Sequence, residues 1–389
     1  MNAIEQIGLS PEQRAGLERA MAHYVDDGKV AGLVTLLARP TGEPYLKAYG
    51  LRHRASGDPM QVDTLMRIAS LTKPITATAV MMLVEEGKLS LSDPVVRFIP
   101  SFGNLKVDAN GETKKLSRSM TIWHLLTHTS GLVYGIFDDT PVASQYRRRG
   151  LRRKRREEIV ATLADLPLAF QPGARWHYSI SYDVLGYIID LVTDRSFEDF
   201  LQERIFRPLG MSDTGFVVPE LLAHRLAAFY TAPNDDGYDL IDDPDESPYL
   251  DRERPRSAGG GLISTAPDYL RFMRMILNDG QLEGTGLLSA DVIRQMISNQ
   301  LPEDMIPLRM GARTMDGVGY GYGFGVKVNG RQVSGQPPEG TFWWAGVTGA
   351  YAWGDPVEQL IGIVMLQSAR YYEPAQTLRS HLYRALEEA

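Results

Sequence analysis

The order of strand-like and helix-like segments is the feature that most constrains how this chain folds. Apolar, β-type runs occur near the N-terminus at residues 32–38 and 45–49. Three more follow near the C-terminus, at residues 322–328, 342–353 and 360–367. The segment between the two ends has mostly helical patterning. This order predicts an α/β lobe assembled from both termini, with a mainly helical lobe inserted in it.

Helices are predicted where apolar residues recur at helical spacing next to capping residues. Ser10 with Gln13 marks a helix start, and that helix is expected to end near residue 27. A second helix is expected from about residue 70 to 86, where Gly87 stops it. Others are expected at 121–127, 157–166, 183–193, 197–205 and 267–278, and one more carries Leu378, Leu382 and Leu386.

The size of the chain predicts two parts within one unit. Its 389 residues exceed the usual size of one compact domain. We expect an α/β lobe of residues 1–69 and 257–389 and a helical lobe of residues 70–256. Apolar residues make up 43% and charged residues 23%, which excludes collagen-like and disordered classes.

Several kinds of chemistry and partner are excluded or disfavoured by composition. The chain has no cysteine, so disulfides, thiolate metal sites and a cysteine nucleophile are excluded. Its 41 Lys and Arg against 48 Asp and Glu give a net charge of −7, which offers no general attraction to nucleic acid or an anionic membrane. Residues 1–6 lack a basic segment before an apolar run, and no stretch approaches the roughly 18 apolar residues of a membrane span. We therefore expect a cytoplasmic protein without nucleic-acid or membrane partners.

Two charge runs interrupt the otherwise mixed sequence. Eight of the ten residues in 147–156 are basic, and nine of the twenty in 234–253 are acidic. A basic run can bind nucleic acid, but no other feature supports that function here. A solvated face or loop is the preferred interpretation, and the two runs are candidates to face each other.

Ser70 and Lys73 form the first candidate catalytic motif, Ser-x-x-Lys. Residues three apart at a helix start share a face, so the hydroxyl and the amine can approach each other. Pro74 is tolerated only in the first helical turn, which places the helix start close to Ser70. There the helix dipole and free N–H groups favour a developing oxyanion, and a desolvated Lys can help to activate the Ser. Alone the motif is weak, because it occurs by chance roughly once per chain.

Other catalytic patterns are absent or disfavoured. There is no Gly-x-Ser-x-Gly turn and no His-Glu-x-x-His motif. His124 and His128 have the spacing of a metal pair on a helix, but residues 127–131 look like a helix end and no carboxylate stands nearby. No metal and no cofactor are therefore expected. The three glycines at 259–261 lack the Lys-Ser/Thr of a phosphate loop and predict close backbone packing beside a site.

A series of motifs, taken together, resembles the serine β-lactamase-like superfamily. In chain order they are Ser70-Leu71-Thr72-Lys73-Pro74, Leu125-Leu126-Thr127-His128-Thr129-Ser130-Gly131-Leu132, Trp176-His177-Tyr178-Ser179, Pro208-Leu209-Gly210-Met211, Gly259-Gly260-Gly261-Leu262 and Trp344-Ala345-Gly346. Specifically, the chain resembles the family VIII carboxylesterases, which look like class C β-lactamases. The resemblance spans roughly residues 10 to 385 and implies a β-lactamase-like α+β fold with an antiparallel sheet flanked by helices.

The resemblance also implies a catalytic trio. Ser70 corresponds to the acylated nucleophile, Lys73 to its partner and Tyr178 to the tyrosine of the second motif. A phenol beside an ammonium has its phenolate favoured, and either group can accept the Ser proton, although the two titrate as one unit. We expect Tyr178 to be the final acceptor, with Lys73 holding the proton network.

The third motif departs from that of the β-lactamases. They carry Lys-Thr/Ser-Gly, whereas this chain has Trp344-Ala345-Gly346 and no lysine after Lys327. Ile180 also replaces the Asn expected two residues after Tyr178. Both changes remove polar anchors for an anionic amide, and Trp-Ala-Gly resembles the Trp-Gly-Gly version of the esterases.

The same segment is expected to supply further site residues. The backbone N–H groups of Ser70 and Val347 are expected to form the oxyanion hole. Trp344, Gly346 and Tyr134 are the expected substrate-binding residues.

These observations predict a serine esterase that acts on small-molecule carboxylic esters of short to medium chain length. The site is expected between the two lobes, and the oligomeric state is undetermined. A β-lactamase or D-alanyl peptidase and an acyltransferase would use the same trio and stay open. A non-catalytic scaffold of the same fold is disfavoured because all three catalytic residue types are present.

Overall fold

The computed structural model of the protein describes residues 7–109, 111–235, 237–328 and 334–388. Residues 1–6, on which the expectation about an export signal rests, lie outside these ranges, so a cytoplasmic location stays a prediction. Among the described residues, no helix combines the length and apolar character that a membrane crossing requires.

One antiparallel sheet of eight strands joins the two ends of the chain. In spatial order the strands are β14 (Val318–Tyr320), β15 (Gly325–Lys327), β16 (Phe342–Ala345), β17 (Tyr351–Asp355), β18 (Leu360–Leu366), β1 (Gly32–Ala38), β2 (Tyr45–His53) and β3 (Asp58–Pro59). The C-terminal strand β18 pairs with the N-terminal β1, with Leu33 opposite Leu366. Every residue of both strands is buried, because helices cover both faces of the sheet. The predicted α+β fold with a sheet built from both termini is confirmed.

Two of the predicted strands are longer than the strands in the structure. The run 342–353 is a hairpin, because the Gly346 N–H donates to Ala350 O (2.7 Å) and Gly349, at φ +93°, turns the chain. The run 322–328 contributes only β15, and the sequence pattern missed β14 before it. Gly323, at φ +89°, turns the chain between these two strands.

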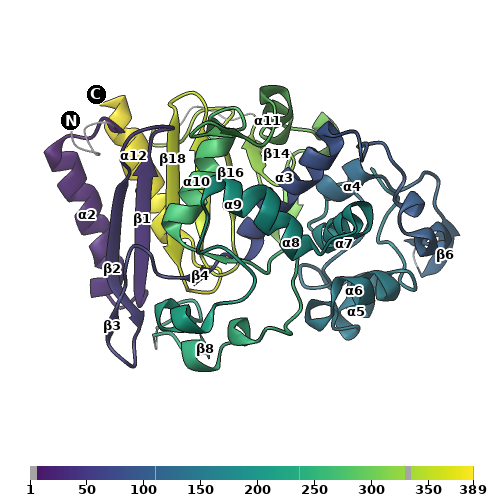
Figure 1. Ribbon diagram of the computed structural model, residues 1–389, viewed down its shortest axis with the longest axis horizontal. Coiled ribbons are helices and arrows are strands. Elements are labelled where there is room, and N and C mark those ends of the chain that lie inside the picture. The colour runs from purple at the N-terminus through teal and green to yellow at the C-terminus, as the bar shows by residue number, and fades with distance from the viewer. Residues whose placement is uncertain (1–6, 110, 236, 329–333, 389) are drawn as a thin grey trace.

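Helices pack on both faces of the sheet (Figure 1). Helices α2 (Pro11–Asp26) and α12 (Glu373–Glu387) lie side by side at the outer edge of the molecule and enclose a small apolar core with β1, β17 and β18. Helix α10 (Ala266–Leu277) contacts β1, β17 and β18 on the inner side. The predicted start of α2 is confirmed, because Ser10 and Gln13 form both hydrogen bonds of a capping box.

The inserted segment is mainly helical and lies at the far end of the molecule from α2 (Figure 1). Its helices are α3 (Thr72–Glu85), α4 (Ile122–Leu126), α5 (Pro141–Arg148), α6 (Arg156–Leu163), α7 (Ser181–Thr193), α8 (Phe197–Leu201) and α9 (Arg207–Leu209), and α11 (Ala290–Met296) follows later in the chain. The sequence pattern did not predict α5. The division into lobes at residues 69 and 257 stays a prediction.

Short two-stranded ribbons complete the fold. They are β4 (Met66–Arg67) with β9 (Ile263–Ser264), β5 (Lys106–Ala109) with β6 (Glu112–Lys115), β7 (Phe229–Tyr230) with β8 (Leu240–Asp242), β10 (Gln281–Leu282) with β11 (Thr285–Gly286), and β12 (Leu308–Met310) with β13 (Arg313–Met315). The β4–β9 ribbon matters for function, because it lies directly before Ser70 and after the glycines at 259–261.

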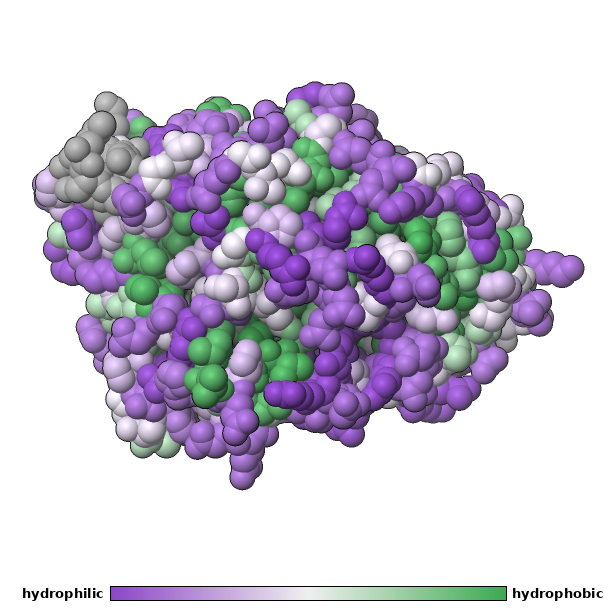
Figure 2. Space-filling view, viewed as in Figure 1, coloured by the Kyte–Doolittle hydropathy of each residue, from purple (hydrophilic) through white to green (hydrophobic). Residues whose placement is uncertain are grey.

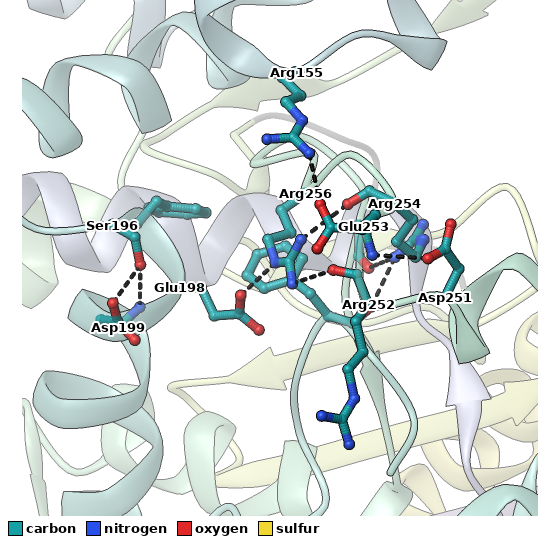
Figure 3. A network of polar contacts seen from close by, with 12 residues as sticks. Arg155, Ser196, Glu198, Asp199, Asp251, Arg252, Glu253, Arg254 and Arg256 are labelled. Carbon is teal, nitrogen blue, oxygen red and sulfur yellow. Dashed lines mark hydrogen bonds and ion pairs between the residues drawn. The ribbon is translucent and has the colours of Figure 1, made fainter. Parts of the chain in front are cut away.

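In the described part of the chain, one ion pair joins the two charge runs, and a further contact lies just beyond the acidic run. Arg155 pairs with Glu253 (2.8 Å), and Arg156 donates to the carbonyl of Arg256. Figure 3 shows Arg256 in turn bound to Glu198 and to the carbonyls of its own loop. Most of the basic run is exposed. It lies on a surface that Figure 2 shows to be mainly hydrophilic, with apolar residues in separate patches.

Candidate active site

Ser70 lies in a short 3-10 turn (Ala69–Leu71) that joins strand β4 to helix α3. Ala69 has φ +45°, a left-handed conformation that a residue with a Cβ rarely adopts. Such strain persists only where the surrounding packing enforces it, and it is common at active sites. The turn therefore presents the Ser70 side chain at the start of α3, as the motif predicts.

The structure brings the three expected catalytic residues together. Lys73 Nζ donates to Ser70 Oγ at 3.2 Å, and the Tyr178 hydroxyl donates to the same oxygen at 2.8 Å. Lys73 reaches Ser70 because the two residues are one helical turn apart. Tyr178 comes from the segment before α7, 108 residues further along the chain.

Lys73 is fully buried and surrounded by aromatic rings. Its Nζ lies 5.4, 4.7 and 5.8 Å from the ring centres of Tyr134, Tyr178 and Tyr182. It also donates to the Gly259 carbonyl at 2.5 Å. Burial lowers the pKa of Lys73 to about 7, with the Asp183 carboxylate acting in the opposite direction. A substantial fraction of Lys73 is therefore a neutral amine at neutral pH.

Burial acts on Tyr178 in the opposite sense. It raises the pKa of the phenol, and the hydrogen bond to Ser70 opposes this only in part. The expectation that a nearby lysine favours the phenolate is therefore outweighed by desolvation. Burial thus favours a neutral amine at Lys73 and a neutral hydroxyl at Tyr178, and both groups are hydrogen-bonded to Ser70 Oγ.

Two backbone N–H groups, those of Ser70 and Val347, are the expected oxyanion donors. In the described part of the chain, neither the Ser70 N–H nor the Val347 N–H donates to an acceptor. The Val347 carbonyl accepts from the Arg370 N–H at 2.7 Å. This hydrogen bond fixes the backbone directly after the Val347 N–H. Gly346 has no room for a side chain, since a Cβ there would lie 2.4 Å from Ile68 O. Gly346 thus packs against the backbone before Ser70 and is not one of the residues that line the cavity.

A cavity of about 780 Å³ opens over Ser70. Tyr134, Tyr178, Trp344 and Val347 all contribute to its wall, and the substrate-binding role of Trp344 and Tyr134 stays a prediction. The Trp344 ring centre lies 5.5 Å from that of Tyr178, so the indole also holds the phenol in place. The volume suits a small organic molecule.

Comparisons with known proteins place this geometry in a family. The Beta-lactamase family matches residues 17–386. The chain belongs to the beta-lactamase family. Because the match covers nearly the whole chain, the nucleophile turn, the cavity and the sheet all lie within the family domain.

Individual relatives refine this assignment. Protein Rv1367c of Mycobacterium tuberculosis is 37% identical over 361 residues, covering 90% of this chain and 89% of the relative. Esterase EstB of Burkholderia gladioli is 32% identical over 383 residues, covering 92% and 91%. The solved structure of EstCE1, a hydrolase with promiscuous acyltransferase activity, superposes with a TM-score of 0.83 at 25% identity, covering 95% and 98%. The chain is a serine hydrolase, and its predicted resemblance to the esterases of this superfamily is confirmed.

The two candidate metal-binding histidines do not share a site. Helix α4 ends at Leu126, so His128 lies beyond it and His124 Nδ1 accepts from the Thr121 N–H that starts the same helix. His128 is fully buried, 4.7 Å from the Tyr178 ring centre, and its Nδ1 accepts from the Ser179 N–H. Within the described ranges no group of three or more metal-ligating side chains occurs.

Sequence reasoning missed part of the surroundings of Lys73. It expected close packing at residues 259–261, and a Cβ at Gly259 would indeed lie 2.8 Å from the Tyr134 hydroxyl and 3.0 Å from Asp183 Oδ2. It did not identify Asp183, Tyr182 or the Gly259 carbonyl as neighbours of Lys73. The one available signal was position, because Asp183 lies in the first turn of the helix that follows Tyr178.

Proposed function

We propose that the protein is a carboxylesterase that hydrolyses short- to medium-chain esters through an acyl-enzyme on Ser70. The observation that carries the proposal is the placement of Ser70 Oγ within hydrogen-bonding distance of both Lys73 and Tyr178, at the wall of a cavity. The relationship to Esterase EstB supports an ester as the substrate.

In the acylation step, Ser70 Oγ forms a bond to the ester carbonyl carbon. Its proton passes to neutral Lys73, directly or through the Tyr178 hydroxyl, which can donate its own proton as it accepts the new one. The N–H groups of Ser70 and Val347 stabilise the charge on the carbonyl oxygen. The bond to the alcohol oxygen then breaks, and the alcohol leaves with the proton held by the pair.

In the deacylation step, a water molecule takes the place of the alcohol. The Lys73–Tyr178 pair accepts a proton from the water, whose oxygen attacks the acyl carbon. The bond to Ser70 Oγ breaks, Ser70 regains a proton and the carboxylic acid leaves. The cavity volume provides room for both the acyl group and an attacking molecule.

Turnover of p-nitrophenyl butyrate and of a chromogenic cephalosporin tests the proposal. We expect ester turnover that Ser70→Ala abolishes and Ser119→Ala leaves intact, because Ser119 is exposed and is not one of the residues that line the cavity. Intact mass spectrometry during turnover should show a butyryl adduct on the wild-type chain alone. Full ester turnover by Ser70→Ala would overturn the site, and faster cephalosporin than ester turnover would favour a β-lactamase.

Acyl transfer is a second candidate activity, because EstCE1 is a hydrolase with promiscuous acyltransferase activity. An alcohol that enters in place of water would yield a new ester from the same acyl-enzyme. Adding 1-propanol to the butyrate assay and measuring propyl butyrate against butyrate separates transfer from hydrolysis. Butyrate alone would exclude transfer to this acceptor.

A further inference from the structure

The cavity wall is basic, although the chain as a whole is acidic. Arg313, Lys327, Arg370 and Arg379 line one part of the cavity. Three more cations, Arg152, Lys154 and Arg254, line another part. Against these seven stand two carboxyl groups, Asp183 and Asp316. A chain with a net charge of −7 therefore gathers positive charge around its nucleophile.

These cations bind carbonyls, hydroxyls or aromatic rings where they have partners, and not carboxylates. In the part of the chain that the structure describes, none of the seven has a carboxylate oxygen within 4 Å, whereas ion pairs are frequent elsewhere. Like charges close together repel one another, most strongly where a cavity limits solvent. An anion in the cavity would relieve this repulsion.

Three arginines, Arg313, Arg370 and Arg379, form what we call the arginine group. The backbone of Arg370 binds the Val347 carbonyl, so its side chain starts directly beside the proposed oxyanion hole. Arg379 reaches from α12 and donates to the Tyr351 hydroxyl at 2.8 Å. Its Nε atom is buried and, among the described residues, has no hydrogen-bond partner.

Two tyrosines line the same cavity and are affected by the charges of the group. Burial raises the pKa of Tyr351, and the charges of Arg379 and Arg313 both oppose that rise. Burial raises the pKa of Tyr372 as well, opposed by Arg370 and Arg313. Tyr351 pairs with Ala345 across the β16–β17 hairpin. Ala345 lies one residue before Gly346 and two before Val347. The arginine group thus lines the same cavity as Ser70 and Val347, where the proposed reaction takes place.

We propose that the arginine group binds a carboxylate on the substrate, so that the preferred esters carry a negative charge. Guanidinium groups suit this role because their paired N–H donors match the two oxygens of a carboxylate. The inference rests on the proposed esterase function and names its substrate class. It assigns recognition to β13, to the loop after β18 and to α12, far in sequence from the trio.

Two matched pairs of esters test this proposal and show which half of the substrate carries the charge. For the acyl half, p-nitrophenyl hydrogen glutarate is compared with p-nitrophenyl valerate. For the alcohol half, 4-butyryloxybenzoate is compared with its methyl ester. We expect kcat/KM to be at least about tenfold higher for the charged member of one pair, with the advantage shrinking as salt is added.

Arginine variants then locate the recognition. Arg313→Gln and Arg379→Gln should each lower the charged-to-neutral ratio by about tenfold, and a general loss of activity cancels in that ratio. Arg309→Gln is the matched control, because Arg309 is exposed on the paired strand of the same β12–β13 ribbon and lies outside the cavity. A wild-type ratio of one or less in both pairs, or a ratio unchanged in both variants, overturns the proposal.

A binding experiment separates this inference from the proposed reaction. In the Ser70→Ala variant, calorimetry should show tighter binding of methyl hydrogen glutarate than of methyl valerate. Adding Arg379→Gln to that variant should remove the difference. If no ester is turned over but this difference is present, the reaction assignment fails and the anion subsite stands. Equal binding within this pair, and equal binding of 4-butyryloxybenzoate and its methyl ester, overturns the subsite.

Discussion

Lys73 shows how burial can set the chemistry of a single residue. Its amine is enclosed by tyrosine rings and bonded to the Gly259 carbonyl and to Ser70. Among the described residues no carboxylate forms an ion pair with it, so desolvation is the largest influence on its pKa, opposed by the charge of Asp183. A lysine in water would hold its proton at pH 7, whereas this one releases it near that pH.

The pH dependence of esterase activity follows from the lowered pKa of Lys73. Because the base must be neutral, kcat/KM should rise with pH, with a midpoint at about 7, and level off above it. Initial rates with p-nitrophenyl butyrate between pH 5 and 9 measure this rise of kcat/KM. A midpoint near the ordinary lysine value of 10.5 would contradict the role of burial.

The same shift links Lys73 to folding stability. The unfolded chain keeps the Lys73 proton up to the ordinary pKa, whereas the folded chain releases it near 7. The unfolded state therefore binds more protons between these two values, so this residue makes the free energy of unfolding rise with pH across that window.

Gly346 controls the position of the proposed oxyanion donor. In Gly346→Ala the new Cβ would lie 2.4 Å from Ile68 O, which forces the β16 end away from Ser70. We expect kcat/KM to fall by about a hundredfold, as for the loss of one oxyanion donor. Gly286→Ala is the control, because the nearest atom to its Cβ would be 4.0 Å away. Equal activity of the two variants would show that Val347 needs no such support.

Among the elements, helices α6 and α7 are tied together by one arginine. Arg156 binds both oxygens of Asp190, at 2.8 to 3.0 Å, and also the Arg256 carbonyl. Its side chain is 11% exposed, whereas the neighbouring Arg155–Glu253 pair has side chains 56% and 80% exposed. The two pairs thus combine similar chemistry with very different solvent screening.

Stability measurements should separate these two pairs. Arg156→Ala should lower the free energy of unfolding by about 2–3 kcal/mol, because it removes the guanidinium from the Arg256 carbonyl and from a partly buried carboxylate that keeps the Phe197 N–H as a donor. Arg155→Ala should lower it by less than about 1 kcal/mol, because water screens that pair. Urea unfolding followed by circular dichroism checks both, and equal losses would contradict the assignment to burial.

Element prediction succeeded where a local signal exists. The start of α2 was predictable because Ser10 and Gln13 satisfy the first backbone N–H groups by themselves. The hairpin within 342–353 was not predictable from the sequence. Its turn requires glycine at 346 and 349, because these positions pack closely against Ile68 and Leu366, which are distant in sequence. A continuous apolar run does not reveal such a turn.

At the scale of the whole molecule, helix α3 joins the two predicted lobes. Residues 72–83 are buried throughout. Much of what covers them comes from the C-terminal part of the chain: the Tyr269 hydroxyl donates to Leu71 O, Thr76 donates to Ala258 O, and Gly323 packs against Pro74. The helix that carries Lys73 therefore depends on both parts of the chain.

This dependence predicts how a fragment should behave. Residues 70–256 expressed alone should lack a cooperative thermal transition, because α3 would expose one apolar side to water. Near-ultraviolet circular dichroism during heating measures whether the transition is cooperative, with the full chain as the control. A sharp transition in the fragment would show that the inserted segment folds independently of the sheet.

The sequence by itself determined the local features of this protein. The spacing of Ser70 and Lys73, the absence of cysteine and the apolar periodicity are properties of residue order and composition, so the nucleophile motif and the α+β class could be predicted. Only the tertiary structure decided that Tyr178 meets Ser70, that Lys73 is buried away from water, and that Val347, Arg313 and Arg379 line one cavity. Desolvation and charge proximity depend on which distant segments pack together, and no local pattern encodes that packing.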